Sequence, residues 1–209
     1  MATTADPPSQ TLMGLQQPLT LFYKHLHDAI REELGVIMNL ASDFLSRGSS
    51  GSAEYLSAVS ILRKKNHFLE FVYKYHSTIE DEVLYPVLEA KIKNVTLAYS
   101  VEHEDEEYLL EGLSALLAQA SDLGRVDGDG AGGGGHSGSK SKAEDIESFV
   151  HGLARKVEEV NTTLRKHLDK EEEQLLPLLR DQFTIQEQSD LVVQFMCCIP
   201  VSDMTRMLK

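Results

Sequence analysis

Two segments of the chain repeat one arrangement of histidine, glutamate and proline. Residues 76–86 read HSTIEDEVLYP, and residues 167–177 read HLDKEEEQLLP. In each segment a glutamate follows the histidine by four residues, and a proline follows it by ten. Residues four apart on an α-helix lie one turn apart on the same face, so each histidine–glutamate pair can bind metal from one side. The repetition predicts a metal site with approximate two-fold symmetry.

One such pair alone would say little, because this spacing is common on helices and a histidine on an apolar face is usually a hydrogen-bonded core residue. Two matching pairs are much harder to explain in that way, and two other apolar segments each carry a further histidine. We therefore predict that four imidazoles and two carboxylates share one interior site: His27, His76, Glu80, His103, His167 and Glu171.

A cluster of this kind needs cations in order to be buried. An interior carboxylate without a counter-charge costs on the order of several kcal/mol. Two divalent ions remove that cost, and two carboxylates can bridge them. Imidazole with carboxylate suits iron, manganese and zinc rather than calcium or magnesium. No cysteine lies on these faces, which disfavours a structural zinc site, although zinc or manganese could substitute for iron.

Further polar residues lie beside the predicted ligands. Glu106 follows His103 by about one turn and is a candidate hydrogen-bond partner for a ligand imidazole. Asp81 and Glu172 directly follow the two glutamates and are expected to face solvent, with extra metal-binding oxygens as the alternative. Three tyrosines are candidates to line the cavity: Tyr23, Tyr73 and Tyr99. Three other histidines point away from the site at about 100° per residue: His25, His67 and His151.

Four long segments with helical periodicity must position these residues. Apolar side chains recur in them at steps of three and four residues, over residues 18–46, 53–90, 95–123 and 143–180. We predict an all-α, up-down-up-down four-helix bundle in which the second and fourth helices lie diagonally. Residues 185–195 predict an additional short C-terminal helix that covers one end of the bundle.

The second segment contains a proline inside its helical pattern. Pro86 predicts a kink or an early end of the helix at that point. Around it, one face of the helix is predicted to carry the site and core residues His76, Glu80, Val83, Leu84 and Val87.

The domain organisation follows from composition. Residues 1–17 are predicted to be a flexible N-terminus, and residues 18–209 to form one domain. Within this domain the glycine- and serine-rich residues 124–142 predict a flexible loop, in which His136 is expected to be unstructured. Cys197 and Cys198 are adjacent, so a disulfide framework is not expected. We expect both to be small buried residues of the last helix.

Charge and hydropathy exclude several classes of partner. The 209-residue chain has a formal net charge of −13 and no cluster of lysine and arginine to neutralise phosphates, so we expect no nucleic-acid binding. No run reaches the roughly 18 apolar residues that span a membrane, and residues 1–10 do not read as a signal peptide. We expect an intracellular protein of the nucleus, the cytoplasm or both.

At its predicted ligands the chain resembles the hemerythrin-like family, whose signature is His, His-x-x-x-Glu, His and His-x-x-x-Glu. The resemblance covers about residues 20–208 and is closest to the hemerythrin domains of plant and algal BRUTUS-type iron-regulating E3 ubiquitin ligases. It rests on five stretches, which are HDAIREEL, YKYHSTIEDEVLYPVLEAKIKNV, YSVEHEDEE, KHLDKEEEQLLPLL and FMCCIPV.

This resemblance implies a non-haem diiron centre with an oxo, hydroxo or water bridge. By similarity, His27 and His76 would bind one ion and His103 and His167 the other, with both glutamates bridging. Oxygen-carrying hemerythrins typically have five histidines, so four candidates favour an iron sensor, responsive also to O2, over a reversible oxygen carrier. With two cysteines the chain cannot form a RING, so we expect a sensor domain of a ubiquitin ligase rather than an enzyme.

Three alternatives remain open at this stage. A diiron oxidase is disfavoured, because ferritin-like sites use Glu-x-x-His and more carboxylates. An oxygen-binding protein would use the same ligands. A helical interaction module, with zinc in the same cage or with no metal, is the third.

Overall fold

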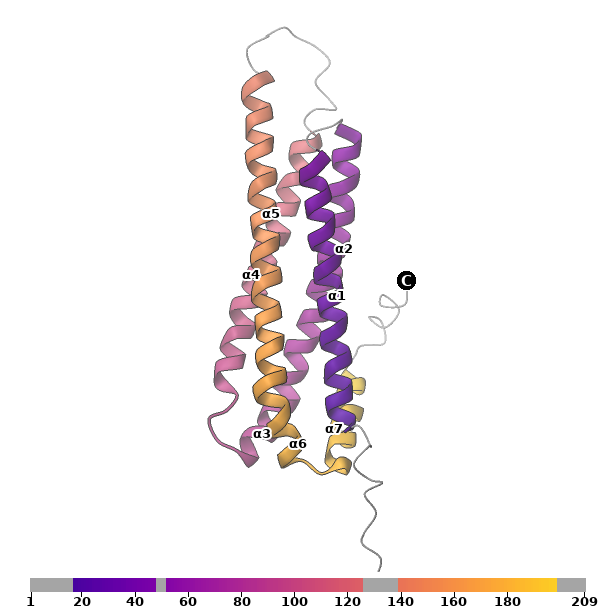
Figure 1. The fold of residues 1–209 in the computed structure, drawn as a ribbon, viewed down its shortest axis with the longest axis vertical. Helices are drawn as coiled ribbons and strands as arrows, with labels where there is room; N and C mark the ends of the chain where they lie inside the picture. The colour runs from indigo at the N-terminus through magenta and orange to yellow at the C-terminus, as the bar shows by residue number, and fades with distance from the viewer. Residues whose placement is uncertain (1–16, 48–51, 126–138, 199–209) are drawn as a thin grey trace, which may run out of the picture.

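A computed structural model describes residues 17–47, 52–125 and 139–198, and in these ranges every regular element is helical (Figure 1). The elements are α1 (Pro18–Arg47), α2 (Ser52–Ile79), α3 (Tyr85–Lys91), α4 (Leu97–Arg125), α5 (Ser139–Lys170), α6 (Leu176–Gln182) and α7 (Ile185–Cys198), with π-helical turns at Glu80–Leu84 and Glu171–Leu175. Each π-helical turn joins two helices into one continuous rod, so four long rods and one shorter helix result.

The four rods form the predicted bundle. Helix α1 packs against α2 and α5, and α4 packs against the same two helices, so α2 and α5 lie on a diagonal. Helix α7 folds back along α1 near the end of the bundle where α3 and α6 meet (Figure 1). The rings of Phe22 and Phe195 lie 5.7 Å apart there, and the Tyr75 hydroxyl donates to the Phe195 carbonyl oxygen at 2.5 Å. The all-α bundle with its extra C-terminal helix is confirmed.

Two apolar clusters fill the interior. The smaller lies at the end of the bundle formed by α3, α6 and α7 and includes Leu84 and Leu179. The larger fills the rest of the bundle and includes Leu34, Leu69 and Leu113. Along each of the four rods the predicted ligand histidine falls between a residue of one cluster and a residue of the other. The polar side chains are therefore held in a dry layer between two packed cores.

The proline in each repeat follows a widened turn and does not end the helix. The N–H of Tyr85 donates to the carbonyl of Glu80, five residues earlier, and Pro86 comes immediately afterwards in α3. Proline lacks an N–H and clashes with the carbonyl four residues before it, and the wider turn accommodates both effects. The second repeat has the same geometry, because the N–H of Leu176 donates to the carbonyl of Glu171 and Pro177 follows immediately in α6. Of the kink or early end predicted at Pro86, the end does not occur, and the irregularity is a widened turn just before the proline.

The widened turn also shifts the buried face by one residue. Val87, predicted to face the core, is 36% exposed, whereas the next residue, Leu88, is fully buried. A π-helical turn holds one extra residue, so the positions that face inward after it move on by one. In this way Leu84 and Leu88 share the inward face.

Three predictions at the ends of elements change or fall outside the described residues. Helix α4 extends to Arg125 and α5 begins at Ser139, so both ends of the predicted 124–142 loop are helical. Residues 126–138, which include His136, and residues 1–16 lie outside the described ranges. The two cysteines lie in α7 as predicted, but they are exposed, because they follow the last buried residue of that helix, Phe195.

The turn from α3 to α4 is fixed by one carboxylate. Glu89 accepts hydrogen bonds of 2.8–2.9 Å from the backbone N–H groups of Asn94, Val95 and Thr96. Asn94 has a φ of 64°, a left-handed conformation that asparagine tolerates. The turn thereby sets the start of α4, which carries His103. None of the helices in the described ranges is both long enough and apolar enough to cross a membrane.

Candidate metal centre

The six predicted ligands meet in the layer between the two cores. Their side chains are at most 3% exposed and come from α1, α2, α4, α5 and the two π-helical turns. The three histidines that were predicted to point away are all exposed, and they are His25, His67 and His151. Helical geometry in the sequence was therefore enough to separate inward from outward histidines.

Glu171 lies in the middle of the four imidazoles. Its Oε2 atom is 3.4 Å from Nε2 of His27 and 3.5 Å from Nε2 of His76. Its Oε1 atom is 3.3 Å from Nε2 of His167 and 3.9 Å from Nε2 of His103. One carboxylate oxygen thus faces each pair of histidines, which is the arrangement that a bridging carboxylate requires.

Glu80 approaches from the opposite side. Its Oε2 atom is 3.1 Å from Nε2 of His76 and 3.2 Å from Nε2 of His103, so it lies between the two histidine pairs. The Nε2 atoms of His103 and His167 are 3.1 Å apart, about the separation of two nitrogen ligands on one ion. With Glu171, these residues offer ligand atoms that all lie within 4.8 Å of one another. The group can hold metal.

Several of these atoms lack hydrogen bonds although they are fully buried. Buried polar atoms in folded proteins are nearly always paired, so a group of unpaired atoms needs an explanation. The unpaired atoms are Nε2 of His27, both ring nitrogens of His76, both carboxylate oxygens of Glu80 and Oε2 of Glu171. Among them, the Nε2 atoms of His27 and His76 lie 3.4 and 3.5 Å from Oε2 of Glu171. Cations bound among them would satisfy both the charge and the lone pairs, so the residues fit a metal centre.

Burial opposes charge on these side chains. It raises the pKa of Glu80 well above 4.5, and the nearby charge of Glu171 raises it further. Burial also lowers the pKa of His76 from 6.5 to about 3, against the attraction of Glu171. His76 is therefore neutral, as a metal ligand must be. Burial opposes charge on Glu171 as well, but hydrogen bonds from His167 and His27 hold its pKa well below 4.5. A divalent cation would remove the penalty that remains on Glu80.

Carboxylates outside the centre orient two of the imidazoles. Oε1 of Glu172 lies 2.9 Å from Nδ1 of His27, and Oδ2 of Asp81 lies 2.9 Å from Nδ1 of His103. Each bond leaves Nε2 aimed into the centre. Glu172 also accepts a hydrogen bond from Arg31 at 2.6 Å. The expectation that Asp81 and Glu172 simply face solvent is wrong, because the adjacent helix brings an imidazole against each of them.

The ligand histidine of the fourth rod, His167, contacts an outer carboxylate of α4 that the sequence did not reveal. Oε2 of Glu102 lies 3.1 Å from Nδ1 of His167, and Lys170 donates to its other oxygen at 2.5 Å. Glu106 lies 3.5 Å from the same Nδ1 atom and accepts a hydrogen bond from Tyr73, so its predicted place beside a ligand imidazole holds. Glu102 directly precedes a ligand histidine, but only the packing of α4 against α5 shows which imidazole it meets.

Aromatic rings close the centre. Tyr23 and Tyr73 pack on His76, and Tyr99 packs on His167, as predicted for cavity-lining residues. A fourth tyrosine was not predicted. This residue is Tyr85. Its hydroxyl donates to Oε1 of Glu171 at 2.7 Å, and its ring stacks on that of His103 at an interplanar angle of 8°.

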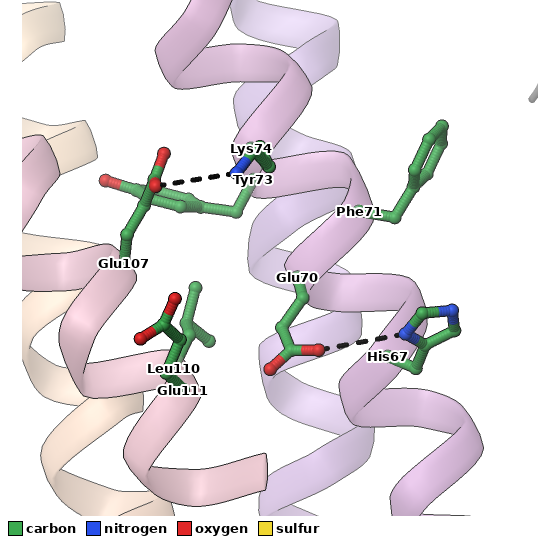
Figure 2. Close-up of a pocket in the computed structure, with 8 residues that line it drawn as sticks. All are labelled: His67, Glu70, Phe71, Tyr73, Lys74, Glu107, Leu110 and Glu111. Atoms are coloured by element: carbon green, nitrogen blue, oxygen red, sulfur yellow. Dashed lines mark ion pairs between the residues drawn. The ribbon is translucent and has the colours of Figure 1, made fainter.

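A surface groove of about 310 Å³ lies between α2 and α4 (Figure 2). Glu107 and Lys74 face each other across it at 3.9 Å. The ring of Tyr73 lines the groove and also lies 5.6 Å from the ring of His76. Tyr73 is fully buried, so its ring contributes both to the lining of the groove and to the packing around His76.

Comparison with known proteins assigns the family. The profile of the Hemerythrin HHE cation binding domain matches residues 20–179. The zinc finger protein BRUTUS of Arabidopsis thaliana is 31% identical over 182 residues, and two BRUTUS-like zinc finger proteins of that plant are each 30% identical. These matches cover 87–88% of this chain but only 12% of each relative. No solved structure matches significantly. The chain therefore belongs to the hemerythrin HHE cation-binding family.

Proposed function

We propose that this chain is an iron-sensing domain that holds a diiron centre between its four long rods. In this proposal His27 and His76 bind one iron, His103 and His167 bind the other, and Glu171 bridges them with one oxygen on each. Glu80 is the second bridge, since its Oε2 atom lies between a histidine of each pair.

The unpaired buried atoms of the centre carry this proposal. Without cations, two carboxylates and four imidazoles would share a dry interior, at a cost of several kcal/mol for each charged group, by order of magnitude. Two dications convert these groups into ligands. Metal binding uses all six residues at once.

Iron is favoured over the other cations that these ligands accept. Imidazole and carboxylate suit iron, manganese and zinc, and none of the six residues is a thiolate. The sequence motifs of the chain resemble those of BRUTUS-type iron-regulating ligases, and the chain is 31% identical to BRUTUS over 182 residues. This resemblance supports iron as the native metal. Manganese and zinc are expected to bind as substitutes.

A sensing role follows from the origin of the ligands. They come from all four rods, so bound metal stabilises the packed bundle relative to its unfolded state. Iron supply then controls how much of the domain is folded and rigid. Ubiquitin transfer, where it occurs in a longer protein of this kind, would be carried out by other regions.

Thermal melting with and without Fe(II) under anaerobic conditions tests the proposal. At a free Fe(II) concentration about 100-fold above the dissociation constant, stability should rise by about 2.7 kcal/mol, or roughly 5–10 °C for a chain of this size. His76→Ala should lose the shift, and Glu173→Gln, an exposed position two residues from Glu171, should keep it. An unchanged melting temperature of the wild-type chain would refute the proposal. Repeated consumption of O2 with added Fe(II) would instead identify an oxidase.

A further inference from the structure

The two halves of the centre differ in their outer carboxylates. On one side, Nδ1 of His103 meets Asp81 at 2.9 Å, and Nδ1 of His167 meets Glu102 at 3.1 Å and Glu106 at 3.5 Å. Three carboxylates therefore surround one histidine pair. Lys170, bonded to Glu102, offsets part of their charge.

The other half is poorer in negative charge. Nδ1 of His27 meets Glu172 at 2.9 Å, but Arg31 binds the same carboxylate oxygen at 2.6 Å. Nδ1 of His76 is fully buried and has no hydrogen-bond partner among the described residues. This half therefore has one outer carboxylate, already paired with an arginine, for two imidazoles.

The sequence explains the difference. Helices α1 and α4 each carry a tyrosine four residues before their ligand histidine. In α4 the residue just before the histidine is Glu102, which reaches the imidazole of α5. In α1 the corresponding residue is Leu26, and the position that matches Glu106 is Ile30. The approximate two-fold symmetry relates α1 to α4 and His76 to His167. Leu26 and Ile30 therefore occupy the positions from which carboxylates would reach His76, and both are apolar.

We propose that the two metal positions differ in affinity, and that the first ion binds between His103 and His167. The inference rests on the proposed function. A carboxylate on Nδ1 fixes the ring and makes the imidazole a stronger ligand, and each such partner changes metal affinity by roughly 10–100-fold. Glu80 and Glu171 are common to both positions, so they cancel from the comparison. We expect the two dissociation constants to differ by at least about tenfold.

A calorimetric titration of the metal-free chain with Fe(II) under anaerobic conditions tests this order. The wild-type chain should bind in two resolved steps. Asp81→Asn and Glu172→Gln are a matched pair, because both side chains are about one-third exposed and each bonds one imidazole. Asp81→Asn should weaken the tight step by roughly 10–100-fold. Glu172→Gln should leave the tight step unchanged and weaken the second.

Removing one histidine from each half locates the steps. His27→Ala should keep one tightly bound ion, and His103→Ala should lose the tight step, with circular dichroism checking that both variants fold. Two equal steps in the wild-type chain, or a tight step that responds to Glu172→Gln and not to Asp81→Asn, would overturn the inference while leaving the diiron proposal intact. A wild-type chain that binds no Fe(II) would refute the diiron proposal itself.

Discussion

Single side chains decide whether the centre can hold two ions, and Glu171 has the most central position. All four imidazoles approach its two oxygens to within 3.9 Å, and Tyr85 holds one of those oxygens. The two oxygens of Glu171 face different histidine pairs, whereas Glu80 reaches both pairs through one oxygen. Removal of its charge should therefore affect both metal positions.

We predict that Glu171→Gln weakens iron binding at both positions by more than about 100-fold, because even an outer partner of a ligand contributes 10–100-fold. Equilibrium dialysis against Fe(II) measures the loss. Glu173→Gln, exposed on the same π-helical turn, is the control and should bind like the wild-type chain. Equal iron binding by both variants would show that Glu171 is not a metal ligand.

The sequence predicted which side chains point inward, but not which carboxylates bond which imidazoles. The repeated His-x-x-x-Glu pairs and the helical period were enough to bring six residues to one place. The bonds of Asp81, Glu172 and Glu102 to imidazoles were not predictable, because each joins neighbouring rods whose relative rotation is set by packing. Tyr85 was missed for a related reason, since it follows a π-helical turn that changes its direction.

At the scale of elements, the two π-helical turns position the glutamates and move the inward-facing positions on by one residue. The turn at Glu80–Leu84 holds one residue more than a regular α-helical turn would. Deletion of one exposed residue from it should therefore convert it to a regular helix without rotating the rest. The same deletion in a regular helix rotates everything that follows by about 100°.

We predict that deletion of Glu82 leaves a folded chain that still binds iron, whereas deletion of Lys64 does not. Both residues are exposed, but Lys64 lies in the regular part of α2, so its loss would turn Leu69 and His76 away from the interior. Circular dichroism melting and iron binding measure both effects. Pro86 would then lie in a regular helix, so the Glu82 deletion should lower the free energy of unfolding by up to about 3 kcal/mol. Similar behaviour of the two deletions would contradict the account of the turn.

The turn between α3 and α4 predicts a pH dependence of stability. Hydrogen bonds from the backbone of Thr96 and Asn94 lower the pKa of Glu89 from 4.5 to about 2. The contribution of this carboxylate to stability is therefore complete above pH 4.5 and is lost as the pH falls toward 2. Glu89→Gln should lower the melting temperature at pH 7, and its difference from the wild-type chain should shrink below pH 4.5. Glu104→Gln, on the exposed face of α4, should show no such trend.

Helix boundaries show where element-scale prediction from sequence stops. Proline at position 86 indicated an irregularity, and the structure has one, but as a widened turn and not as an end. Val87 was placed on the wrong face for the same reason, since a period of 3.6 residues does not anticipate an inserted residue. Glycine content likewise overestimated the loop, because Ser139 and the residues that follow it are helical.

Over the whole molecule, the order of the helices was predictable because the first two connections are short, which makes those neighbouring rods antiparallel, and the longer third connection permits the same topology. That order puts α2 and α5 on a diagonal and makes their repeated motifs face each other. The environment of α7 was less predictable. Its periodicity indicated a helix, but the exposure of Cys197 and Cys198 depends on where α7 leaves the bundle surface.

The two apolar clusters and the polar layer between them behave as one cooperative unit in this account. Bound metal would link all four rods at the layer, so its loss should weaken the contact between the two clusters as well as the centre itself. The amount of iron bound per folded chain is therefore the quantity that tests the proposed diiron centre.

The most direct test is the iron-to-protein ratio of the chain after anaerobic reconstitution with Fe(II) and removal of loosely bound metal by gel filtration. We predict two iron ions per chain in the wild-type protein and fewer than one in Glu171→Gln. A folded wild-type chain that retains no iron, or a variant that retains as much as the wild type, would contradict it.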